Sequence, residues 1–248
     1  MAGGPLSDRA LARGWQLRRL SVCASTEVEL ARWLAARQTA AARLAVVARR
    51  QRFGVGQQGR TWVSPPGGLW LSAAFPWRQE LPGSASLGLA AAVGIALQLE
   101  LLGVAVQLKW PNDLLVDGCK LAGLLPRLRM RGPSVRWAQV GVGINGCNRL
   151  PAIGPPGAIS LAQALGGQRH HPQARPERLL PRVLAGLDWA AAHAHQPETV
   201  RLAAEARLWH PEGGWLQGDE TWQVLGLHAD GRLRLGRADR ELALMRVF

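Results

Sequence analysis

The chain has 248 residues and a formal net charge of +13, and a chain of this length buries roughly 70–75% of its unfolded surface, so its core needs no disulfide or metal. Arginine is scattered, no run of five basic residues occurs and no nucleic-acid-binding motif is present, which favours anionic substrates or an acidic partner over DNA. Cys23, Cys119 and Cys147 lack zinc-site spacing, so we expect reduced thiols. Neither an apolar run of 18 residues nor a signal pattern occurs, so we expect a cytoplasmic protein.

Hydrophobic periodicity and turn residues predict alternating strands and helices along the chain. Residues 1–14 are rich in glycine, alanine and arginine, and we expect them to be flexible or disordered. Thr26 and Glu29 have capping-box spacing, and Pro181 is expected to break its helix. The predicted strands are 17–22, 44–48, 69–75, 106–116, 119–125 and 137–144, and the predicted helices are 26–37, 84–102, 159–165, 176–195 and 198–209.

The hydrophobic pattern of the sequence changes near Gly213. Short alternating runs at 221–227, 232–235 and 241–247 are separated by turn residues, which predicts a small antiparallel barrel. We therefore divide the chain into a flexible segment at 1–14, an α+β body at 15–209 and a β-barrel at 210–248.

A polar, glycine-containing loop between the strands at 44–48 and 69–75 is the most informative segment. Its glycines, Gly54, Gly56 and Gly59, expose backbone N–H groups and allow close approach of a ligand, which predicts an anion-binding loop. The same spacing matches the dinucleotide-binding fingerprint, but the prolines after Arg60 prevent the helix that the fingerprint needs. A flexible hairpin connection is the alternative.

A second segment contains both lysines of the chain, Lys109 and Lys120. Lys109 opens the run Lys-Trp-Pro-Asn-Asp, and an Asp-Gly hairpin turn leads to Lys120-Leu-Ala-Gly. A lysine can neutralise a carboxylate and a phosphate brought together, and Asp113 can hold Mg²⁺. A third segment, Gly-Val-Gly-Ile-Asn, ends a strand at Asn145 with an amide that can bind phosphate.

Each of these residues also has a purely structural interpretation. Lys120 can be a solvated hairpin lysine, and Asp113 can cap the turn after the proline and asparagine. Trp62 can belong to the core, and Asn145 can simply end its strand.

The order and combination of its motifs make the chain resemble the biotin–protein ligases. The matching segments are Ser25-Thr26 and residues 51–62, 109–113, 120–123 and 141–145. The resemblance implies an α+β, class II synthetase-like catalytic domain with a mixed sheet and flanking helices, followed by a small C-terminal SH3-like β-barrel. Regulatory members add an N-terminal winged helix, for which there is no room before Leu17, so a monofunctional ligase without a DNA-binding domain is expected.

The resemblance implies an ATP-dependent ligase that forms biotinyl-5′-adenylate from biotin and ATP. It would then transfer biotin to a lysine of the biotin carboxyl carrier protein of acetyl-CoA carboxylase, with Mg²⁺ as cofactor and neither DNA nor a membrane as partner. A homodimer is left open. The alternatives are a lipoate or octanoyl ligase or transferase of the same fold, and a non-catalytic basic binding module.

The resemblance also implies roles for individual residues. Ser25, Thr26 and Gln51 would line the biotin pocket, and Lys120 would contact the biotin carboxylate and the phosphate under attack. Lys109 and Asp113 would support attack by the acceptor lysine or hold the metal. The loop around Gly54, Gly56 and Gly59 would close over the adenylate, Arg60 would face a phosphate, and Trp62 would stack on the adenine. The remaining implied contacts are Val55, Gln57, Gly123, Gly143 and Asn145.

Three positions depart from the family pattern. Glu27 stands where an asparagine is usual, and Val55 and Gln57 replace two loop arginines that help to retain the adenylate. We expect Lys120, Arg60 and Arg52 to compensate for the missing charge.

Overall fold

A seven-stranded sheet forms the centre of the computed structural model, which describes residues 14–36, 42–77, 84–131, 134–150, 157–167 and 171–245. The predicted disorder of residues 1–13 lies outside this range. The strand order is β1-β2-β3-β7-β6-β5-β4, and only β1 and β2 are parallel, so the predicted mixed sheet is confirmed. The strands are β1 (Trp15–Cys23), β2 (Arg43–Gln51), β3 (Leu69–Phe75), β4 (Gln107–Lys109), β5 (Asp113–Val116), β6 (Cys119–Arg131) and β7 (Ser134–Ile144).

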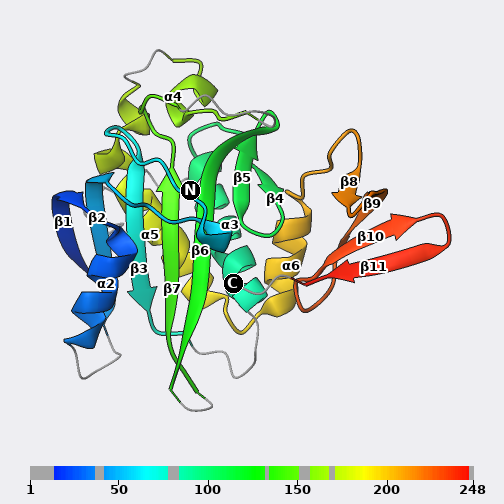
Figure 1. Ribbon diagram of the computed structural model, residues 1–248, viewed down its shortest axis with the longest axis horizontal. Coiled ribbons are helices and arrows are strands. Elements are labelled where there is room, and N and C mark those ends of the chain that lie inside the picture. The colour runs from blue at the N-terminus through cyan, green and yellow to red at the C-terminus, as the bar shows by residue number, and fades with distance from the viewer. Residues whose placement is uncertain are drawn as a thin grey trace, which may run out of the picture.

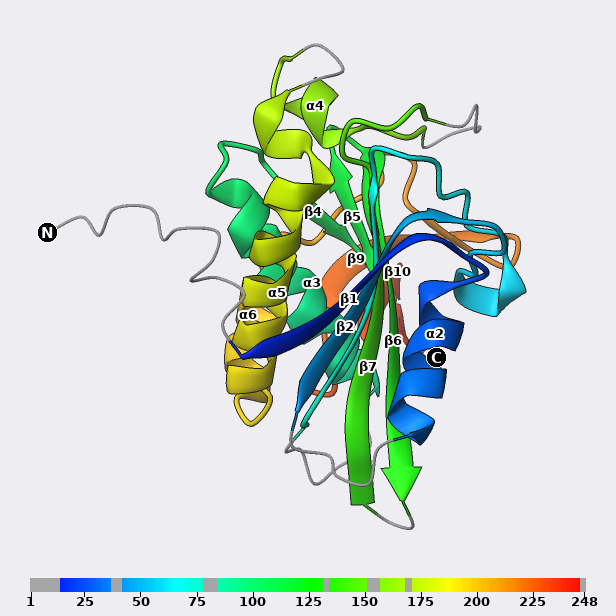
Figure 2. The same ribbon diagram turned by 90° about the vertical axis from the view of Figure 1, so that its left-hand side faces the viewer.

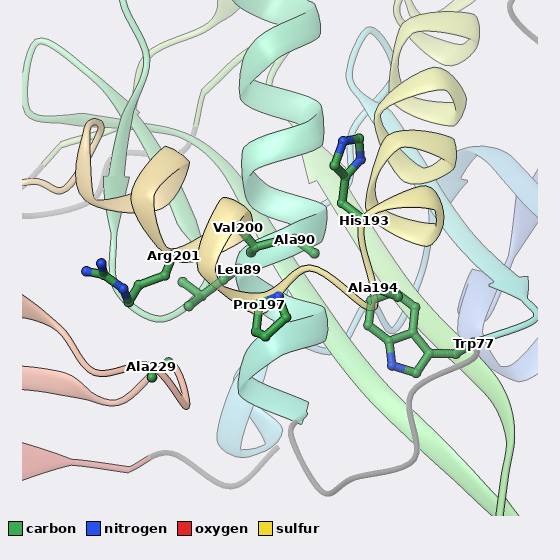
Figure 3. Close-up of a pocket in the computed structure, with 10 residues that line it drawn as sticks. Trp77, Leu89, Ala90, His193, Ala194, Pro197, Val200, Arg201 and Ala229 are labelled. Atoms are coloured by element: carbon green, nitrogen blue, oxygen red, sulfur yellow. The ribbon is translucent and has the colours of Figure 1, made fainter.

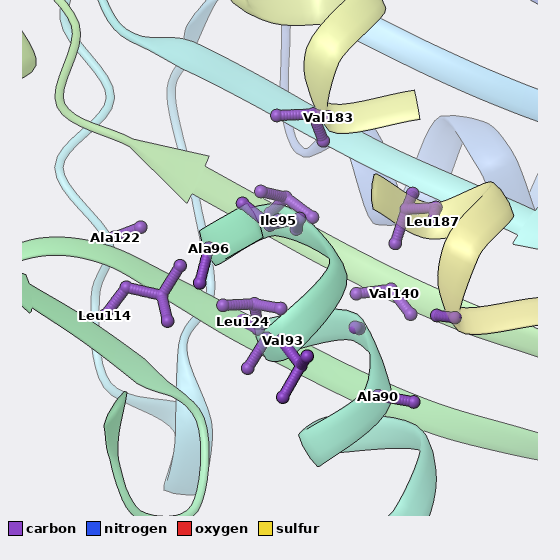
Figure 4. Close-up of a cluster of buried hydrophobic side chains, with 14 of the residues drawn as sticks. Ala90, Val93, Ile95, Ala96, Leu114, Ala122, Leu124, Val140, Val183 and Leu187 are labelled. Carbon is purple, nitrogen blue, oxygen red and sulfur yellow. The ribbon is translucent and has the colours of Figure 1, made fainter. Parts of the chain in front are cut away.

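Helices cover both faces of this sheet. Figure 2 shows α3 (Ser84–Glu100), α5 (Pro176–Ala192) and α6 (Pro197–Glu205) on one face and α2 (Thr26–Ala35) on the other. Strand β3 is buried along its whole length, as expected for a strand covered on both sides. The larger core fills the α3–α5 side, where Ile95 and Val93 meet Val140 and Leu124 of the sheet (Figure 4). A smaller cluster around Leu30 and Trp33 lies beneath α2.

Two details of the helices differ from the sequence predictions. The N-cap of α2 is Ser25, whose side chain accepts a hydrogen bond from the backbone N–H of Glu27, so the capping box predicted for Thr26 and Glu29 is wrong. Thr26 is instead the first helical residue. The predicted break at Pro181 is also wrong, because α5 continues through this buried proline. Burial of the apolar face that surrounds it offsets one missing backbone hydrogen bond.

The Asp-Gly turn forms as predicted. Asp117 and Gly118 both have positive φ, at 50° and 70°, as a type I′ hairpin turn requires, and they join β5 to β6. This turn places Lys120 on the strand next to Asp113. The remaining short helices are η1 (Gln57–Gly59), α4 (Leu161–Ala164) and η2 (Pro172–Ala174).

A four-stranded antiparallel sheet follows the body (Figure 1). Its strands are β8 (Trp215–Gln217), β9 (Glu220–Leu227), β10 (Leu233–Arg237) and β11 (Arg240–Leu244). The small C-terminal sheet is confirmed, β8 was not predicted, and the SH3-like closure stays a prediction. The proposed boundary after Trp209 also stays a prediction, because Trp222 and Leu227 of this sheet belong to the large core of the body.

Specific contacts join the C-terminal sheet and its turns to the body. The Trp110 Nε1 donates to the Gly231 carbonyl at 2.9 Å, and Glu205 accepts from the backbone N–H of Leu227 at 2.7 Å. Figure 3 shows a small apolar hollow near this junction, beside Pro197 and Ala229, whose volume is only about 10 Å³. Such a volume holds about one water molecule and no larger ligand. No helix in the described ranges is long and apolar enough to span a bilayer.

Helices α3 and α5 touch backbone to backbone at Gly94 and Gly186. A Cβ on Gly94 would collide with the Gly186 carbonyl oxygen, and one on Gly186 would lie 2.7 Å from the Gly94 oxygen. Replacing glycine by alanine in a helix is otherwise stabilising by about 0.5–1 kcal/mol. The sign of the change in the free energy of unfolding on replacing Gly94 by alanine therefore tests this contact.

We expect Gly94→Ala to lower the free energy of unfolding by about 1–3 kcal/mol, because the two helices must separate. Thermal unfolding measures this as a lower Tm. Gly213→Ala is the control, since a Cβ there meets nothing within 4 Å. An unchanged or higher Tm for Gly94→Ala would contradict this account of the packing.

Candidate functional site

A cavity of about 630 Å³ lies on the α2 face of the central sheet. The start of α2, the glycine loop, strands β3 and β5–β7 and Trp215 of the C-terminal sheet contribute to its wall. The structure brings to this wall every predicted site residue except Gly54 and Gly59. The lining residues that were predicted are Ser25, Thr26, Gln51, Val55, Gly56, Gln57, Arg60, Trp62, Lys109, Asp113, Lys120, Gly123, Gly143 and Asn145.

Hydroxyl and amide groups cluster at the start of α2. The backbone N–H and the hydroxyl of Thr26 both donate to the Gln51 Oε1, at 2.8 and 3.0 Å. The Thr26 hydroxyl also shares a 2.8 Å hydrogen bond with the hydroxyl of Ser72. Ser25, Thr26 and Ser72 are buried, so this end of the cavity is a polar pocket within an otherwise apolar layer. Ser72 was missed because a single serine within the apolar run of β3 gives no motif.

The glycine loop forms a closed hairpin rather than an open coil. The Trp62 N–H donates to the Gly54 carbonyl at 2.8 Å, and the Gly56 N–H donates to the Arg60 carbonyl at 2.7 Å. A Cβ on Gly54 would lie 2.5 Å from the Trp62 oxygen, and Gly59 has a φ of +72°. Gly54 and Gly59 thus shape the loop and do not line the cavity.

The Trp62 indole rests on a platform made by two glycines of the sheet. Gly123 of β6 and Gly143 of β7 are cross-strand partners, and a Cβ on them would lie 2.9 and 2.6 Å from the indole. The Trp62 Nε1 is buried and has no hydrogen-bond partner. Only glycine leaves room for a flat ring here. The predicted stacking of Trp62 on adenine stays a prediction.

Lys120 pairs with Asp113, and Lys109 lies opposite Asp113 on the neighbouring strand. The Lys120 Nζ lies 2.7 Å from the Asp113 Oδ2 and 5.0 Å from the centre of the Trp62 ring. Lys109 is the cross-strand partner of Asp113, and its Nζ lies 5.3 Å from the centre of the Trp209 ring. Two lysines and one aspartate line this part of the wall, which gives it a net positive charge toward an incoming anion.

Two asparagines hold the strands that carry these charges. The Asn112 side chain donates to the Leu124 carbonyl, and the Leu124 N–H donates back to the Asn112 carbonyl at 2.9 Å, which ties the turn before Asp113 to β6. The Asn145 Nδ2 donates to the Lys120 carbonyl at 3.4 Å. Asn112 was missed as a site residue, although the Pro-Asn turn is a recognisable signal for it.

The family departures also have a structural context. Glu27 lines the cavity and pairs with Arg127 of β6 at 2.7 Å, a partner that the sequence does not reveal because it lies 100 residues away. Arg60 lines the cavity and donates to the Gln58 Oε1 at 3.0 Å. Arg52 is exposed and does not line it, so of the expected compensating cations only Arg60 and Lys120 reach the cavity.

This arrangement is suited to binding anions rather than to covalent catalysis by the protein. Within the described ranges no group of three His, Cys, Asp or Glu side chains could hold a metal by itself, and the cavity wall contains neither histidine nor cysteine. What the wall offers is a polar pocket, a paired lysine and a glycine loop. Together these groups can bind a polar head group at one end and place a phosphate near a cation at the other.

Comparison with known proteins finds similarity over the part of the chain that carries most of the site. The model described as "Biotin/lipoate A/B protein ligase family" matches residues 26–145. The bifunctional ligase/repressor BirA of Bacillus subtilis (strain 168) is 36% identical over 127 residues, which cover 49% of this chain and 39% of that protein. The biotin–(acetyl-CoA-carboxylase) ligase of Paracoccus denitrificans is 38% identical over 103 residues, covering 40% of this chain and 43% of its own. The matched segments therefore span less than half the length of these relatives.

Solved structures share the fold over nearly the whole chain. The biotin protein ligase from Aquifex aeolicus in complex with biotin and ATP has a TM-score of 0.74 at 23% identity, covering 93% of this chain and 96% of that one. The Leishmania major enzyme in complex with biotinyl-5-AMP has a TM-score of 0.62 at 22% identity, covering 93% and 99%. Thr26, Gln51 and Ser72 of the polar pocket, the glycine loop and both lysines lie within residues 26–145, the segment that is similar to the biotin/lipoate A/B protein ligase family.

Proposed function

We propose that the chain is an ATP-dependent biotin–protein ligase, which forms biotinyl-5′-adenylate and transfers biotin to a lysine of a carrier protein. The observation that carries this proposal is the Lys120–Asp113 pair beneath Trp62, in the same cavity as the polar pocket of Thr26 and Gln51. Relatives named for biotin ligation, and neighbours bound to biotin with ATP or to biotinyl-5-AMP, support it.

The chemistry of the polar pocket favours biotin over lipoate. Biotin's cyclic urea has one carbonyl acceptor and two N–H donors, whereas the dithiolane ring of lipoate has neither. The hydroxyls of Ser25, Thr26 and Ser72 and the amide of Gln51 provide both donors and acceptors at the inner end of the cavity. An apolar ring would leave the second N–H of Gln51 and the free lone pair of Ser72 without partners, and an unsatisfied buried group typically costs about 1–3 kcal/mol.

In the first step, a carboxylate oxygen of biotin attacks the α-phosphorus of ATP. A new P–O bond forms, and the bond to the departing pyrophosphate breaks. Two anions must approach each other, so electrostatic repulsion is the main barrier. Lys120 can neutralise both anions from one position, and its ion pair with Asp113 holds the ammonium there.

In the second step, the amine of the acceptor lysine attacks the acyl carbon, the bond to AMP breaks, and the amine loses a proton. Asp113, which lines the cavity and pairs with Lys120, is the carboxylate that can assist this proton transfer. The glycine loop covers the cavity and can exclude water from the reactive anhydride.

A magnesium ion fits this wall only as a cation shared with the substrate. Mg²⁺ is commonly held by one or two carboxylates together with substrate phosphates, and Asp113 is the carboxylate beside Lys120. When bound, the ion would neutralise phosphate charge. We propose that Asp113 contributes such a ligand and that the acceptor is the biotin carboxyl carrier protein of acetyl-CoA carboxylase, in the cytoplasm.

Replacing Lys120 should abolish adenylate formation. We expect Lys120→Ala to reduce biotin-dependent exchange of ³²P-pyrophosphate into ATP at least about 100-fold, because the two anions then meet without their cation. The control is Arg19→Ala, which removes one positive charge from an exposed position on β1. Exchange in Lys120→Ala at the level of this control would refute the assigned role of the lysine.

The choice of acyl substrate separates the two activities named for the family. Incubation of the protein with ATP and a biotin carrier domain should label that domain with biotin. Incubation with lipoate and a lipoyl carrier domain should not, because the dithiolane leaves the polar pocket unsatisfied. Lipoate labelling without biotin labelling would overturn the proposal in favour of a lipoate ligase.

The net charge of +13 predicts a dependence of transfer on salt. An acidic carrier should be steered toward a basic surface, and this attraction weakens as the Debye length falls from ~10 Å at 0.1 M salt. We therefore expect the rate of transfer at low carrier concentration to fall steeply with added salt. Pyrophosphate exchange without carrier is the reference, and equal salt dependence of both reactions would argue against steering.

A further inference from the structure

A continuous chain of hydrogen bonds links the polar pocket to the glycine loop. It begins at the hydroxyl of Ser72, passes to the Thr26 hydroxyl at 2.8 Å and to the Gln51 Oε1 at 3.0 Å. From the same amide, the Nε2 donates to the Ser64 hydroxyl at 2.8 Å, which donates to the Trp62 carbonyl at 3.1 Å. Ser64 is buried and does not line the cavity.

The direction of every bond in this chain follows from the number of hydrogens. The Thr26 backbone N–H can only donate, so the Gln51 atom that faces it is the oxygen, and the other is the NH₂ group. The single hydroxyl hydrogen of Thr26 goes to that oxygen, which leaves Ser72 to donate to Thr26. Likewise, the hydrogen of Ser64 goes to the Trp62 carbonyl, so Ser64 must accept from Gln51.

This direction decides what the pocket can offer a ligand. Both lone pairs of the Gln51 oxygen are occupied by Thr26, so Gln51 has only its second N–H left to give. Ser72 has spent its hydrogen and can only accept. The groups around Gln51 thus present a fixed donor and a fixed acceptor, which fits a ligand with both polarities.

The loop is built closely around the middle of the chain. A Cβ on Gly54 would lie 3.0 Å from the Ser64 Oγ and 3.1 Å from the Gln51 Nε2. The Gln51 backbone N–H also donates to the Ser64 carbonyl, at 3.4 Å. Side-chain and backbone contacts therefore join Gln51 and Ser64 at the base of the hairpin that carries Trp62.

We propose that Ser64 is a positioning residue that orients the Gln51 amide for the head group and ties it to Trp62 of the loop, whereas Ser72 orients the Thr26 hydroxyl and also presents its own acceptor to the head group. The proposal rests on the proposed function in naming biotin as the head group. Ser64 acts through Gln51 and never touches the ligand. Removing it should therefore weaken biotin binding and loosen the loop together, whereas removing Ser72 should weaken biotin binding alone.

The first experiment needs no substrate. The loop contains Arg52 and Arg60, both exposed, so trypsin can report on its opening. We expect Ser64→Ala to raise the rate of cleavage after Arg60 about three- to tenfold, since a lost hydrogen bond shifts the opening equilibrium by that order. Ser21→Ala, which removes an exposed hydroxyl on β1, should cleave like the parent chain. Unchanged cleavage in Ser64→Ala would overturn the link to the loop.

The second experiment measures the KM for biotin in pyrophosphate exchange. We expect Ser64→Ala and Ser72→Ala to raise this KM about three- to tenfold with little change in kcat. In a Gln51→Ala background, Ser64→Ala should add nothing, because its effect passes through the missing amide. An additive double variant, or a Ser64→Ala protein with a lower Tm but an unchanged KM, would refute the positioning role.

The two experiments separate the inference from the function on which it rests. If the parent protein shows no biotin-dependent exchange, the proposed function fails, and the trypsin assay alone then decides whether Ser64 holds the loop. If exchange is normal and neither assay responds to Ser64→Ala, the function stands and the positioning role is wrong.

Discussion

The ion pair between Lys120 and Asp113 is the interaction on which the rest of the site depends. Its side chains are only 27% and 19% exposed, so each charge needs the other in the partly desolvated cavity. The pair also has a geometric basis, because the Asp-Gly turn and the Asn112–Leu124 contacts bring β5 and β6 together at this point. An anion entering the cavity meets a cation that is already held in place, with no reorganisation needed at the moment of reaction.

Local signals in the sequence were sufficient for much of the fold. The bounds of β3 agree with the prediction, and the Asp117-Gly118 turn was recognised because its backbone conformation demands these residue types. The capping of α2 was misassigned by one residue, since Ser25 and Thr26 are both good caps and only the hydrogen bond to Gln51 separates them. The course of α5 through Pro181 depends on burial against other elements, which a proline in a sequence window does not reveal.

Half of the residues that line the cavity were identified from motifs, but their contacts were not. The glycine platform beneath Trp62, formed by Gly123 and Gly143, exists only because β6 and β7 pair in one register, and register is a long-range property. Ser72 and Arg127 were missed for the same reason. A serine in an apolar strand and an arginine among many others carry no local mark, and each acquires its role from a partner distant in sequence, Thr26 or Glu27.

The seat of Trp62 has a consequence for any flat molecule that enters the cavity. The indole occupies the glycine platform with its N–H buried and unpaired, so it gives up a hydrogen bond to remain there. If the Trp62 indole left the platform, its N–H could hydrogen-bond to water. The free energy gained would offset part of the cost of exposing the two glycines. A ring that binds on the glycine platform therefore has to displace an indole whose N–H is unsatisfied. An inhibitor that lies flat on the two glycines, with its own polar atoms hydrogen-bonded, would bind there more favourably than the indole does.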